Sequence, residues 1–255
     1  MTEPASLIEG AAPFELGEGE KGVLLVHGFT GSPQSMRLWG ESLAEAGFSV
    51  KCPLLPGHGT RWEDMQETKW RDWTGAAQEA LDDLSARCAM TFIAGLSMGG
   101  AIACYLAAEN QDAVAGISTV GAAVLNEDPR AFLLPVLKHL LPSLPGVSND
   151  IAEPGMAEVA YDRTPLRAAA ELLSLQRATR ERLSRIGVPA LLFHSRDDHV
   201  VPASNMSYLA KNLGSNDVRL RWLERSYHVA TLDYDRHLIF EESAAFFNEL
   251  ASESR

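Results

Sequence analysis

Short apolar runs alternate with amphipathic, helix-forming stretches along most of this chain, and this alternation constrains its fold more than any other feature. Strands are expected over residues 23–26, 48–52, 90–94, 113–120, 188–193 and 218–223. Helices are expected over residues 33–46, 69–87, 98–108, 203–213 and 235–250. Continuously apolar strands are typical of a parallel sheet buried on both faces, and helices usually connect parallel strands. The order therefore predicts an α/β fold with a mostly parallel central sheet and helices on both faces.

The alternation stops between residues 125 and 186. This stretch contains helix-like pieces separated by prolines and no convincing strand. We therefore expect an all-helical insertion, a cap over residues 125–186, in a core formed by residues 1–124 and 187–255. Its apolar side chains could line a pocket or pack the cap on the core: Phe132, Leu133, Leu134, Val136, Leu137, Leu140, Leu141 and Leu144.

Charge and composition exclude several classes of protein. The formal net charge is −12 and no basic cluster is present, so nucleic acid is not an expected partner. No apolar run approaches the roughly 18 residues of a membrane span, and the acidic N-terminal stretch is unlike a signal peptide. We expect a cytoplasmic protein without stable membrane insertion. The number and spacing of the three cysteines predict free thiols, and no cluster has metal-ligand spacing, so no metal is expected.

The sequence GLSMGG, residues 95–100, lies where an expected strand gives way to an expected helix. The pattern Gly95-x-Ser97-x-Gly99 in this setting is typical of a nucleophile elbow, a tight turn that holds a serine hydroxyl above the end of a sheet. The pattern alone is common enough to arise by chance, and Ser97 could then be a plain turn residue. The strand before it and the helix after it favour a nucleophile.

A serine hydroxyl needs a base, and the base needs a carboxylate that orients it. When a nucleophile elbow is present, the acid and then the histidine follow at later strand ends. Asp198 and His228 each follow an expected strand, and Asp198 opens the pattern D-x-x-V-P. Asp197 is the alternative acid, and Asp233 is expected to cap the last helix. The sequence thus predicts a catalytic triad of Ser97, Asp198 and His228.

Two backbone N–H groups are expected to stabilise the oxyanion of an acyl-transfer reaction. The glycine-rich loop after the first strong strand can bring the N–H of Phe29 beside that of Met98, although it could also be an ordinary strand-to-helix turn. Among the other histidines, His58 is a candidate for contact with substrate or with loop backbone. His194 and His199 are expected to be structural or to lie at the rim of the site.

The segments HGFTGSPQSM, LPGHGT, GLSMGG, DHVVP and SYHVATLD occur in this order. Together they resemble the bacterial carboxylesterase and monoacylglycerol lipase group of the α/β-hydrolase fold. The resemblance extends from Val23 to about Phe247 and is weakest over the insertion. It implies the same site residues: Ser97 as nucleophile, Asp198 as acid, His228 as base, and the amides of Phe29 and Met98 as oxyanion donors.

The resemblance implies a serine hydrolase that needs no cofactor and acts on a small acyl ester, either a short- to medium-chain ester or a monoacylglycerol. Thioester hydrolysis, acyl transfer, perhydrolysis and C–C bond cleavage can use the same triad and stay open as alternatives. A ligand-binding signalling protein that keeps this fold also stays open. We expect the cap to set the preferred acyl length, through side chains such as Leu137 or Leu141.

Overall fold

The computed structural model describes residues 6–146 and 149–253. Residues 1–5 and 254–255 of the predicted core, and residues 147–148 of the predicted cap, lie outside the described residues. The main sheet has seven strands in the order β1-β3-β2-β4-β5-β8-β9. Its strands are β1 (Phe14–Leu16), β2 (Lys21–Val26), β3 (Phe48–Cys52), β4 (Met90–Leu96), β5 (Val114–Val120), β8 (Ala190–Ser195) and β9 (Val218–Leu223). β1 is antiparallel to β3 and every other neighbouring pair is parallel, which confirms the predicted mostly parallel sheet.

Eight α-helices and four short 3₁₀ turns complete the described part of the chain. The helices are α1 (Arg37–Glu45), α2 (Trp62–Met65), α3 (Trp70–Arg87), α4 (Met98–Glu109), α5 (Leu134–Leu140), α6 (Leu166–Arg180), α7 (Ser204–Asn212) and α8 (Arg236–Glu253). The 3₁₀ turns are η1 (Pro33–Met36), η2 (Pro129–Leu133), η3 (Leu183–Arg185) and η4 (Ala230–Leu232). Within the described ranges, no helix has the length and apolar character needed to cross a membrane.

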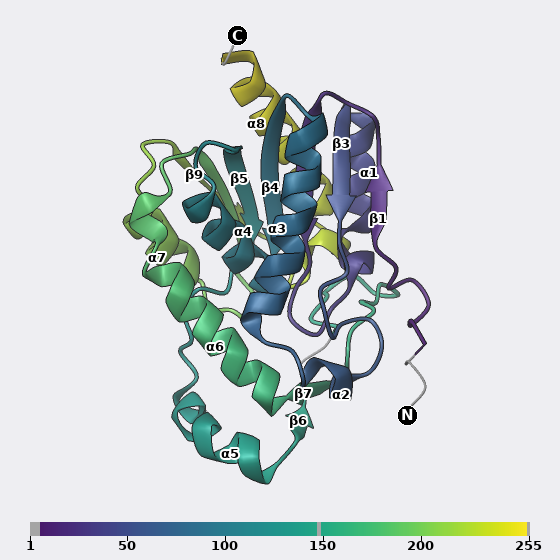
Figure 1. Ribbon diagram of the computed structural model, residues 1–255, viewed down its shortest axis with the longest axis vertical. Coiled ribbons are helices and arrows are strands. Elements are labelled where there is room, and N and C mark those ends of the chain that lie inside the picture. Colours follow the sequence, from purple (N-terminus) through teal and green to yellow (C-terminus); the bar gives the residue numbers. More distant parts are fainter. Residues whose placement is uncertain (1–5, 147–148, 254–255) are drawn as a thin grey trace.

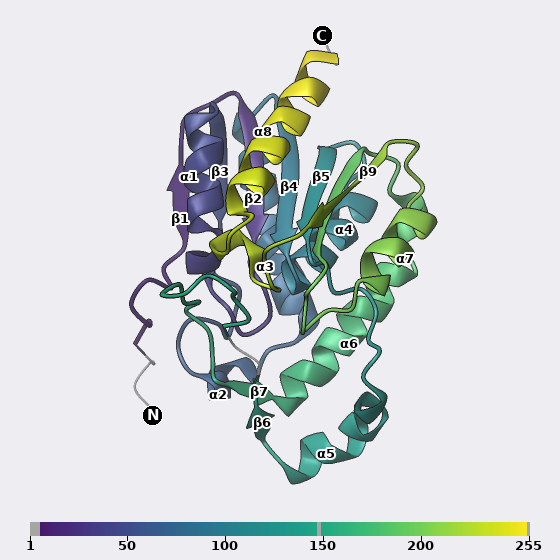
Figure 2. The same cartoon turned by 180° about the vertical axis from the view of Figure 1, so that it is seen from behind.

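The sheet separates two hydrophobic cores. Helices α3 and α4 cover one face (Figure 1), and α1 and α8 cover the other (Figure 2). Neighbouring residues of β4 point to opposite faces: Ile93 packs with Trp73 and Ile102 in the first core, and Phe92 stacks on Phe247 in the second. Both faces of the central strands are therefore buried, which explains why most positions of these strands are apolar.

The predicted helix over 33–46 starts differently from the expectation. Pro33–Met36 forms the 3₁₀ turn η1, and the hydroxyl of Ser32 makes no capping bond. Ser35 donates to the carbonyl of Ser32 from both its N–H, at 3.2 Å, and its hydroxyl, at 3.0 Å. These three-residue contacts tighten the first turn, and the α-helix begins only at Arg37.

The insertion follows β5 and ends before β8, and it lies at the carboxyl ends of the parallel strands (Figure 1). It is not all-helical. Strands β6 (Ser143–Pro145) and β7 (Arg163–Pro165) pair in a separate antiparallel sheet, flanked by α5 and α6. Each strand has three residues and ends in proline, which is too short for an alternating pattern to show in the sequence. From here on, "the insertion" means residues 125–186.

Candidate active site

Ser97 stands in a strained turn between β4 and α4. Its φ of 57° and ψ of −117° are unusual for a residue with a side chain. A Cβ on Gly95 would lie 2.3 Å from the carbonyl of Gly99, and a Cβ on Gly99 would lie 2.0 Å from the carbonyl oxygen of Val26. Only glycine fits at these two positions, so the sequence GLSMG permits a turn that most sequences cannot make.

The turn after β5 bonds to Ser97 and lies next to the predicted His–Asp pair. Ser97 donates its N–H to the carbonyl of Val120 at 2.9 Å, and its own carbonyl accepts the N–H of Ala123 at 3.1 Å. Between them, Gly121 has a φ of +53°, and a Cβ there would lie 3.2 Å from Asp198 Oδ2 and 3.3 Å from His228 Cε1. The three predicted triad residues therefore surround one turn of the backbone.

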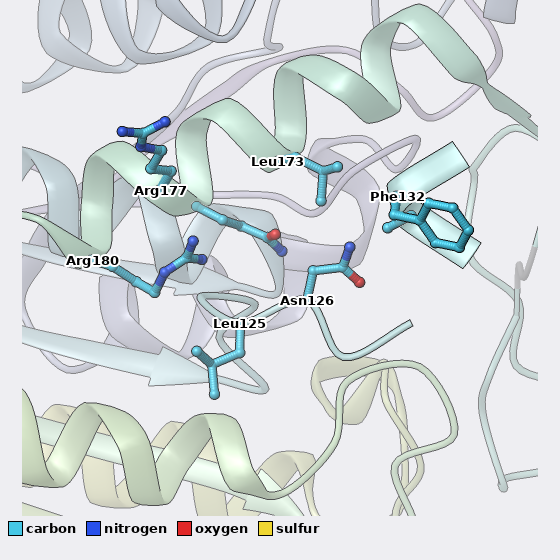
Figure 3. Close-up of a pocket in the computed structure, with 8 residues that line it drawn as sticks. Leu125, Asn126, Phe132, Leu173, Arg177 and Arg180 are labelled. Carbon is cyan, nitrogen blue, oxygen red and sulfur yellow. The ribbon is translucent and has the colours of Figure 1, made fainter. Parts of the chain in front are cut away.

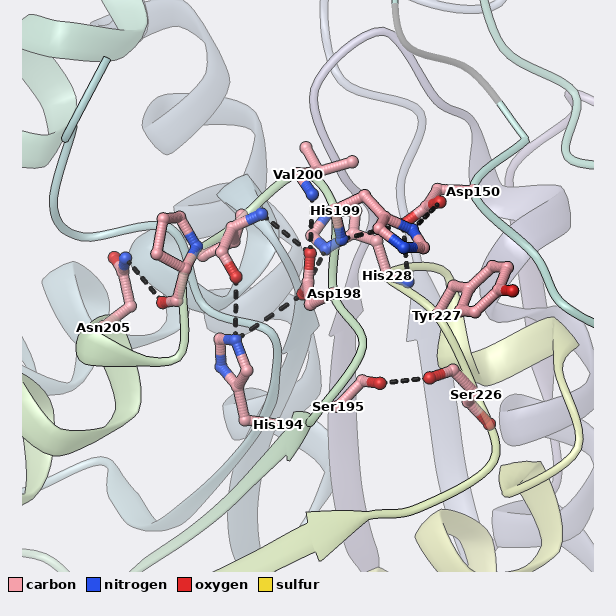
Figure 4. A network of polar contacts seen from close by, with 12 residues as sticks. Asp150, His194, Ser195, Asp198, His199, Val200, Asn205, Ser226, Tyr227 and His228 are labelled. Carbon is pink, nitrogen blue, oxygen red and sulfur yellow. Dashed lines mark hydrogen bonds and ion pairs between the residues drawn. The ribbon is translucent and has the colours of Figure 1, made fainter. Parts of the chain in front are cut away.

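His228 Nδ1 donates a hydrogen bond to Asp198 Oδ2 at 2.8 Å (Figure 4). The other oxygen, Oδ1, accepts the N–H groups of Val200 at 2.9 Å and Val201 at 2.7 Å. The Asp198 side chain is 2% exposed, so water does not compete for it. Asp197, the alternative acid, is exposed and has no such contact with His228. The arrangement favours Asp198 over Asp197.

The electrostatics of this pair favour an ionised acid and a basic imidazole. Burial acts to lower the pKa of His228, but the hydrogen bond and charge of Asp198, with the carboxylates Glu158 and Asp150, outweigh burial and raise it. Burial acts to raise the pKa of Asp198, but His228 and the two backbone donors outweigh it and lower the pKa. Such a pair is suited to accept a proton at His228 while Asp198 stays charged.

In the described part of the chain, no hydrogen bond joins the Ser97 hydroxyl to the His228 ring. Catalytic hydrogen bonds are often long before substrate binds. The two predicted oxyanion donors are also without a partner: among the described residues, the N–H groups of Phe29 and Met98 donate to no protein acceptor. A Cβ on Gly28 would lie 3.5 Å from Ser97 Cβ, so the loop of Phe29 adjoins the serine.

The other histidines have structural contacts. His58 is buried and donates to the carbonyl of Pro56 at 3.1 Å, which matches the loop-backbone alternative. Its ring lies edge-on to His27, and burial lowers the pKa of His58 to about 4 and that of His27 to about 3. His194 donates to the carbonyl of Val201 at 2.9 Å, and His199 is exposed at the rim, 2.8 Å from Asp150.

Asp233 does not cap the last helix with its side chain, contrary to the prediction. Its buried carboxylate accepts four backbone N–H groups, and none of them belongs to α8. The first N–H of α8, from Arg236, bonds instead to the main-chain carbonyl of Asp233. The expectation failed because the sequence places Asp233 just before a helix, while its partners come from the insertion and from the loop of His228.

The insertion supplies two acidic residues that sequence analysis missed. Glu158 is partly buried beside Gly31, where a Cβ would lie 2.6 Å from Glu158 Oε1. Burial raises the pKa of Glu158 to about 7, against the opposing effects of His228 and Ser35. Asp150 accepts the backbone N–H of His228 at 3.0 Å. Both lie in irregular chain without a periodic pattern, so no sequence signal pointed to them.

A cavity of about 490 Å³ lies between the start of the insertion and α6 (Figure 3). Its lining residues are Leu125, Asn126, Ala131, Phe132, Leu173, Gln176, Arg177 and Arg180. None of the predicted site residues lines it, but Leu125 is only two residues beyond Ala123, which bonds to Ser97. Of the apolar cap residues named from the sequence, Phe132 contributes to this cavity, whereas Leu137 and Leu141 do not.

The described ranges contain no obvious metal-binding site. No group of three or more His, Cys, Asp or Glu side chains there is arranged to hold a metal ion. Cys52, Cys88 and Cys104 are free thiols, as predicted from their spacing.

Comparison with known proteins identifies relatives along nearly the whole chain. A thermostable monoacylglycerol lipase from Bacillus sp. (strain H-257) is 42% identical over 248 residues, which are 97% of this chain and 98% of the relative. A carboxylesterase from Bacillus subtilis (strain 168) is 28% identical over 241 residues, or 93% and 96% of the two chains. A solved structure of a metagenome-derived lipolytic enzyme has a TM-score of 0.93 and 41% identity, covering 96% of this chain and all of that one.

These matches confirm the resemblance seen in the sequence motifs and the predicted α/β-hydrolase fold. The family model described as serine aminopeptidase, S33, matches residues 17–235. That span includes β2 to β9, the insertion, and each of the predicted site residues. The chain is therefore a serine hydrolase that belongs to the serine aminopeptidase S33 family.

Proposed function

We propose that this chain hydrolyses carboxylic esters, with short- to medium-chain acyl esters or monoacylglycerols as substrates, through an acyl-enzyme formed on Ser97. The main support is the turn around Gly121, whose flanking residues Val120 and Ala123 bond to the backbone of Ser97 and which leaves no free space between Gly121 and the His228–Asp198 pair. The lipase and esterase relatives support an ester as the substrate.

The proposed reaction begins when His228 Nε2 takes the proton of the Ser97 hydroxyl and Ser97 Oγ attacks the ester carbonyl carbon. The oxygen of that carbonyl becomes an oxyanion, which the N–H groups of Phe29 and Met98 are placed to receive. Removal of one such donor typically costs about 3 kcal/mol of transition-state stabilisation. The N-terminus of α4 adds a favourable electrostatic field at the same place.

The tetrahedral intermediate then collapses, the bond to the alcohol oxygen breaks, and His228 gives its proton to the leaving alcohol. Water next attacks the acyl-enzyme while His228 accepts one of its protons, and the acid is released as Ser97 recovers its proton. Asp198 keeps the imidazole oriented through Nδ1 and stabilises its charged form. It does not itself take up a proton.

The acyl chain has a candidate binding place in the cavity beside α6. Its lining is half apolar (Leu125, Ala131, Phe132 and Leu173) and half polar (Asn126, Gln176, Arg177 and Arg180), and its volume of about 490 Å³ lies in the usual range for small-molecule sites. Leu125 directly follows Val124, and both N–H groups bond to Asn205 Oδ1 of α7, while Ala123 just before them donates its N–H to the carbonyl of Ser97. We therefore assign this cavity to the acyl portion of the substrate.

Activity of wild type and Ser97→Ala on p-nitrophenyl esters from acetyl to palmitoyl, with monoacylglycerols, tests the proposal. Loss of the serine should reduce kcat on the order of 10⁶-fold. Parallel assays on acyl thioesters and on aminoacyl amides, the substrate class suggested by the family description, separate the related chemistries. Turnover of thioesters or aminoacyl amides faster than of any ester would contradict the ester assignment. Slow turnover of every class with tight retention of a ligand would favour a binding protein.

A further inference from the structure

The carboxylate of Asp233 joins two segments that are far apart in the sequence. Oδ1 accepts the N–H of Glu153 at 2.9 Å and that of Tyr234 at 2.8 Å. Oδ2 accepts the N–H of Ala152 at 2.7 Å and that of Tyr227 at 2.8 Å. Each oxygen therefore holds one N–H from the insertion and one from the segment 227–234, which carries His228.

Other contacts strengthen the same junction. Asp150 Oδ2 accepts the backbone N–H of His228 at 3.0 Å, and the carbonyl of Asp150 accepts the N–H of Val229 at 3.1 Å. Glu153 forms an ion pair with Arg236 at the start of α8. Residues 150–153 of the insertion thus lie alongside residues 227–229. Bonds between the two segments are present on both sides of His228.

The burial of Asp233 makes this junction sensitive to chemical change. The residue is fully buried, and a buried carboxylate is tolerated only where hydrogen bonds replace those of water. Four N–H donors converge on it, and both oxygens are used. An amide has one acceptor oxygen and one NH₂ group, so an asparagine here must present a donor to two other donors. Whichever way the amide turns, it loses one bond to the insertion and one to the segment of His228.

We propose that Asp233 is a positioning residue that fixes the base His228 by attaching its segment to residues 150–153 of the insertion. The insertion then helps to hold the base in position and does not only cover the substrate. Positioning matters because small displacements of a catalytic group weaken its contribution to the rate steeply. This inference rests on the proposed function, since it takes His228 as the base.

The test compares Asp233→Asn with a matched control, Asp235→Asn. Asp235 also binds backbone N–H groups of this loop, those of Arg225 at 2.9 Å and Ser226 at 3.0 Å, but it uses a single oxygen for both. An asparagine at 235 can keep both bonds, and neither partner belongs to the insertion. We expect Asp233→Asn to lower kcat roughly 10- to 100-fold with little change in KM. Asp235→Asn should stay close to wild type.

Two readouts distinguish positioning from a general loss of stability. A displaced His228 loses part of its contact with Asp198, so the acid limb of the kcat/KM profile should move to lower pH in Asp233→Asn. Partial unfolding would lower activity at every pH without moving that limb. Hydrogen exchange followed by mass spectrometry should show residues 151–153 and 227–229 exchanging faster together in Asp233→Asn, with both unchanged in Asp235→Asn.

Each outcome decides between supporting and overturning the proposal. Wild-type kcat and pH profile in a folded Asp233→Asn protein overturn it, as do equal losses in the 233 and 235 variants. If Asp233→Asn does not fold, Ala152→Pro takes its place, because proline lacks the N–H that Ala152 donates to Asp233 Oδ2 and leaves every charge near His228 unchanged. Wild-type kcat and a wild-type pH profile in a folded Ala152→Pro protein then overturn the proposal. Retained activity in Ser97→Ala would contradict the proposed function instead, and the exchange result would still test the junction by itself.

Discussion

Asp198 presents its two oxygens to different partners: Oδ1 is held by the N–H groups of the turn that follows it, and Oδ2 receives the proton-bearing Nδ1 of His228 at 2.8 Å. The carboxylate cannot rotate without losing one set of bonds. The imidazole is therefore held in the tautomer that leaves Nε2 without a proton, which is the form that a general base requires.

Asp198→Asn should lower kcat on ester substrates on the order of 10⁴-fold, because an amide at this position favours the wrong tautomer of His228. Asp197→Asn is the matched control, since Asp197 is exposed and adjacent in sequence. Its kcat should remain within about twofold of wild type. Steady-state kinetics of both proteins at one pH provide the measurement, and a reversed order of losses would move the acid role to Asp197.

The pH profile should report the raised pKa of His228. Only the neutral imidazole can accept the proton of Ser97, so kcat/KM should fall as pH drops through the pKa of His228. That midpoint should lie above the ordinary histidine value of about 6.5. Glu158, whose own pKa is raised to about 7, carries a negative charge over the upper part of this limb and there raises the pKa of His228, so Glu158→Gln should move the acid limb slightly to lower pH. Glu127→Gln, at an exposed position, serves as control. If the acid limb of Glu158→Gln stays at its wild-type pH, Glu158 does not raise the pKa of His228.

Two glycines should respond oppositely to alanine. A Cβ on Gly99 would lie 2.0 Å from a backbone oxygen, so Gly99→Ala should lower the free energy of unfolding on the order of 3 kcal/mol. Gly75 lies on the exposed side of α3 with nothing within 4 Å of the added Cβ. Gly75→Ala should raise the free energy of unfolding by about 0.5–1 kcal/mol, because glycine weakens a helix interior. Urea denaturation of the two variants measures both changes, and equal shifts would contradict the reading of the elbow.

Acyl-length preference should depend on the cavity beside α6. Leu173→Trp adds volume inside a space of about 490 Å³, so the preferred p-nitrophenyl ester should become shorter. Leu140 belongs to the same insertion but is 71% exposed and does not line the cavity, so Leu140→Trp should leave the profile unchanged. A shift caused by Leu140→Trp and not by Leu173→Trp would place the acyl chain on the outer face of α5.

Regular elements were predictable because their patterns are local. Strands β3 and β9 match the expected ranges to the residue, and the apolar stripe of α3 is buried as expected. The closeness of Asp198 and His228 also followed from sequence order, since β8 and β9 are parallel neighbours whose carboxyl ends share one edge of the sheet.

Strands too short to show an alternating sequence pattern were missed. β1 is a three-residue edge strand, and β6 and β7 are equally short. The contacts made by Asp150, Glu158 and Asp233 were missed for a different reason. Asp150 and Asp233 each bond to irregular chain about 80 residues away in the sequence. No local sequence pattern encodes such a pairing.

The insertion begins after β5 and ends before β8. These two strands are hydrogen-bonded neighbours, with Val120 beside Phe193. The chain thus departs from the sheet and returns one position along, so the enclosed segment can change length without altering the order of the core strands. Evolution or an engineer could exchange the outer part, η2 and α5, as a replaceable module. The part from 149 to 161 is bound to the core through Asp233 and through the N–H of Tyr161, which bonds to Thr30. A successful chimaera should keep that inner part and graft only the outer one.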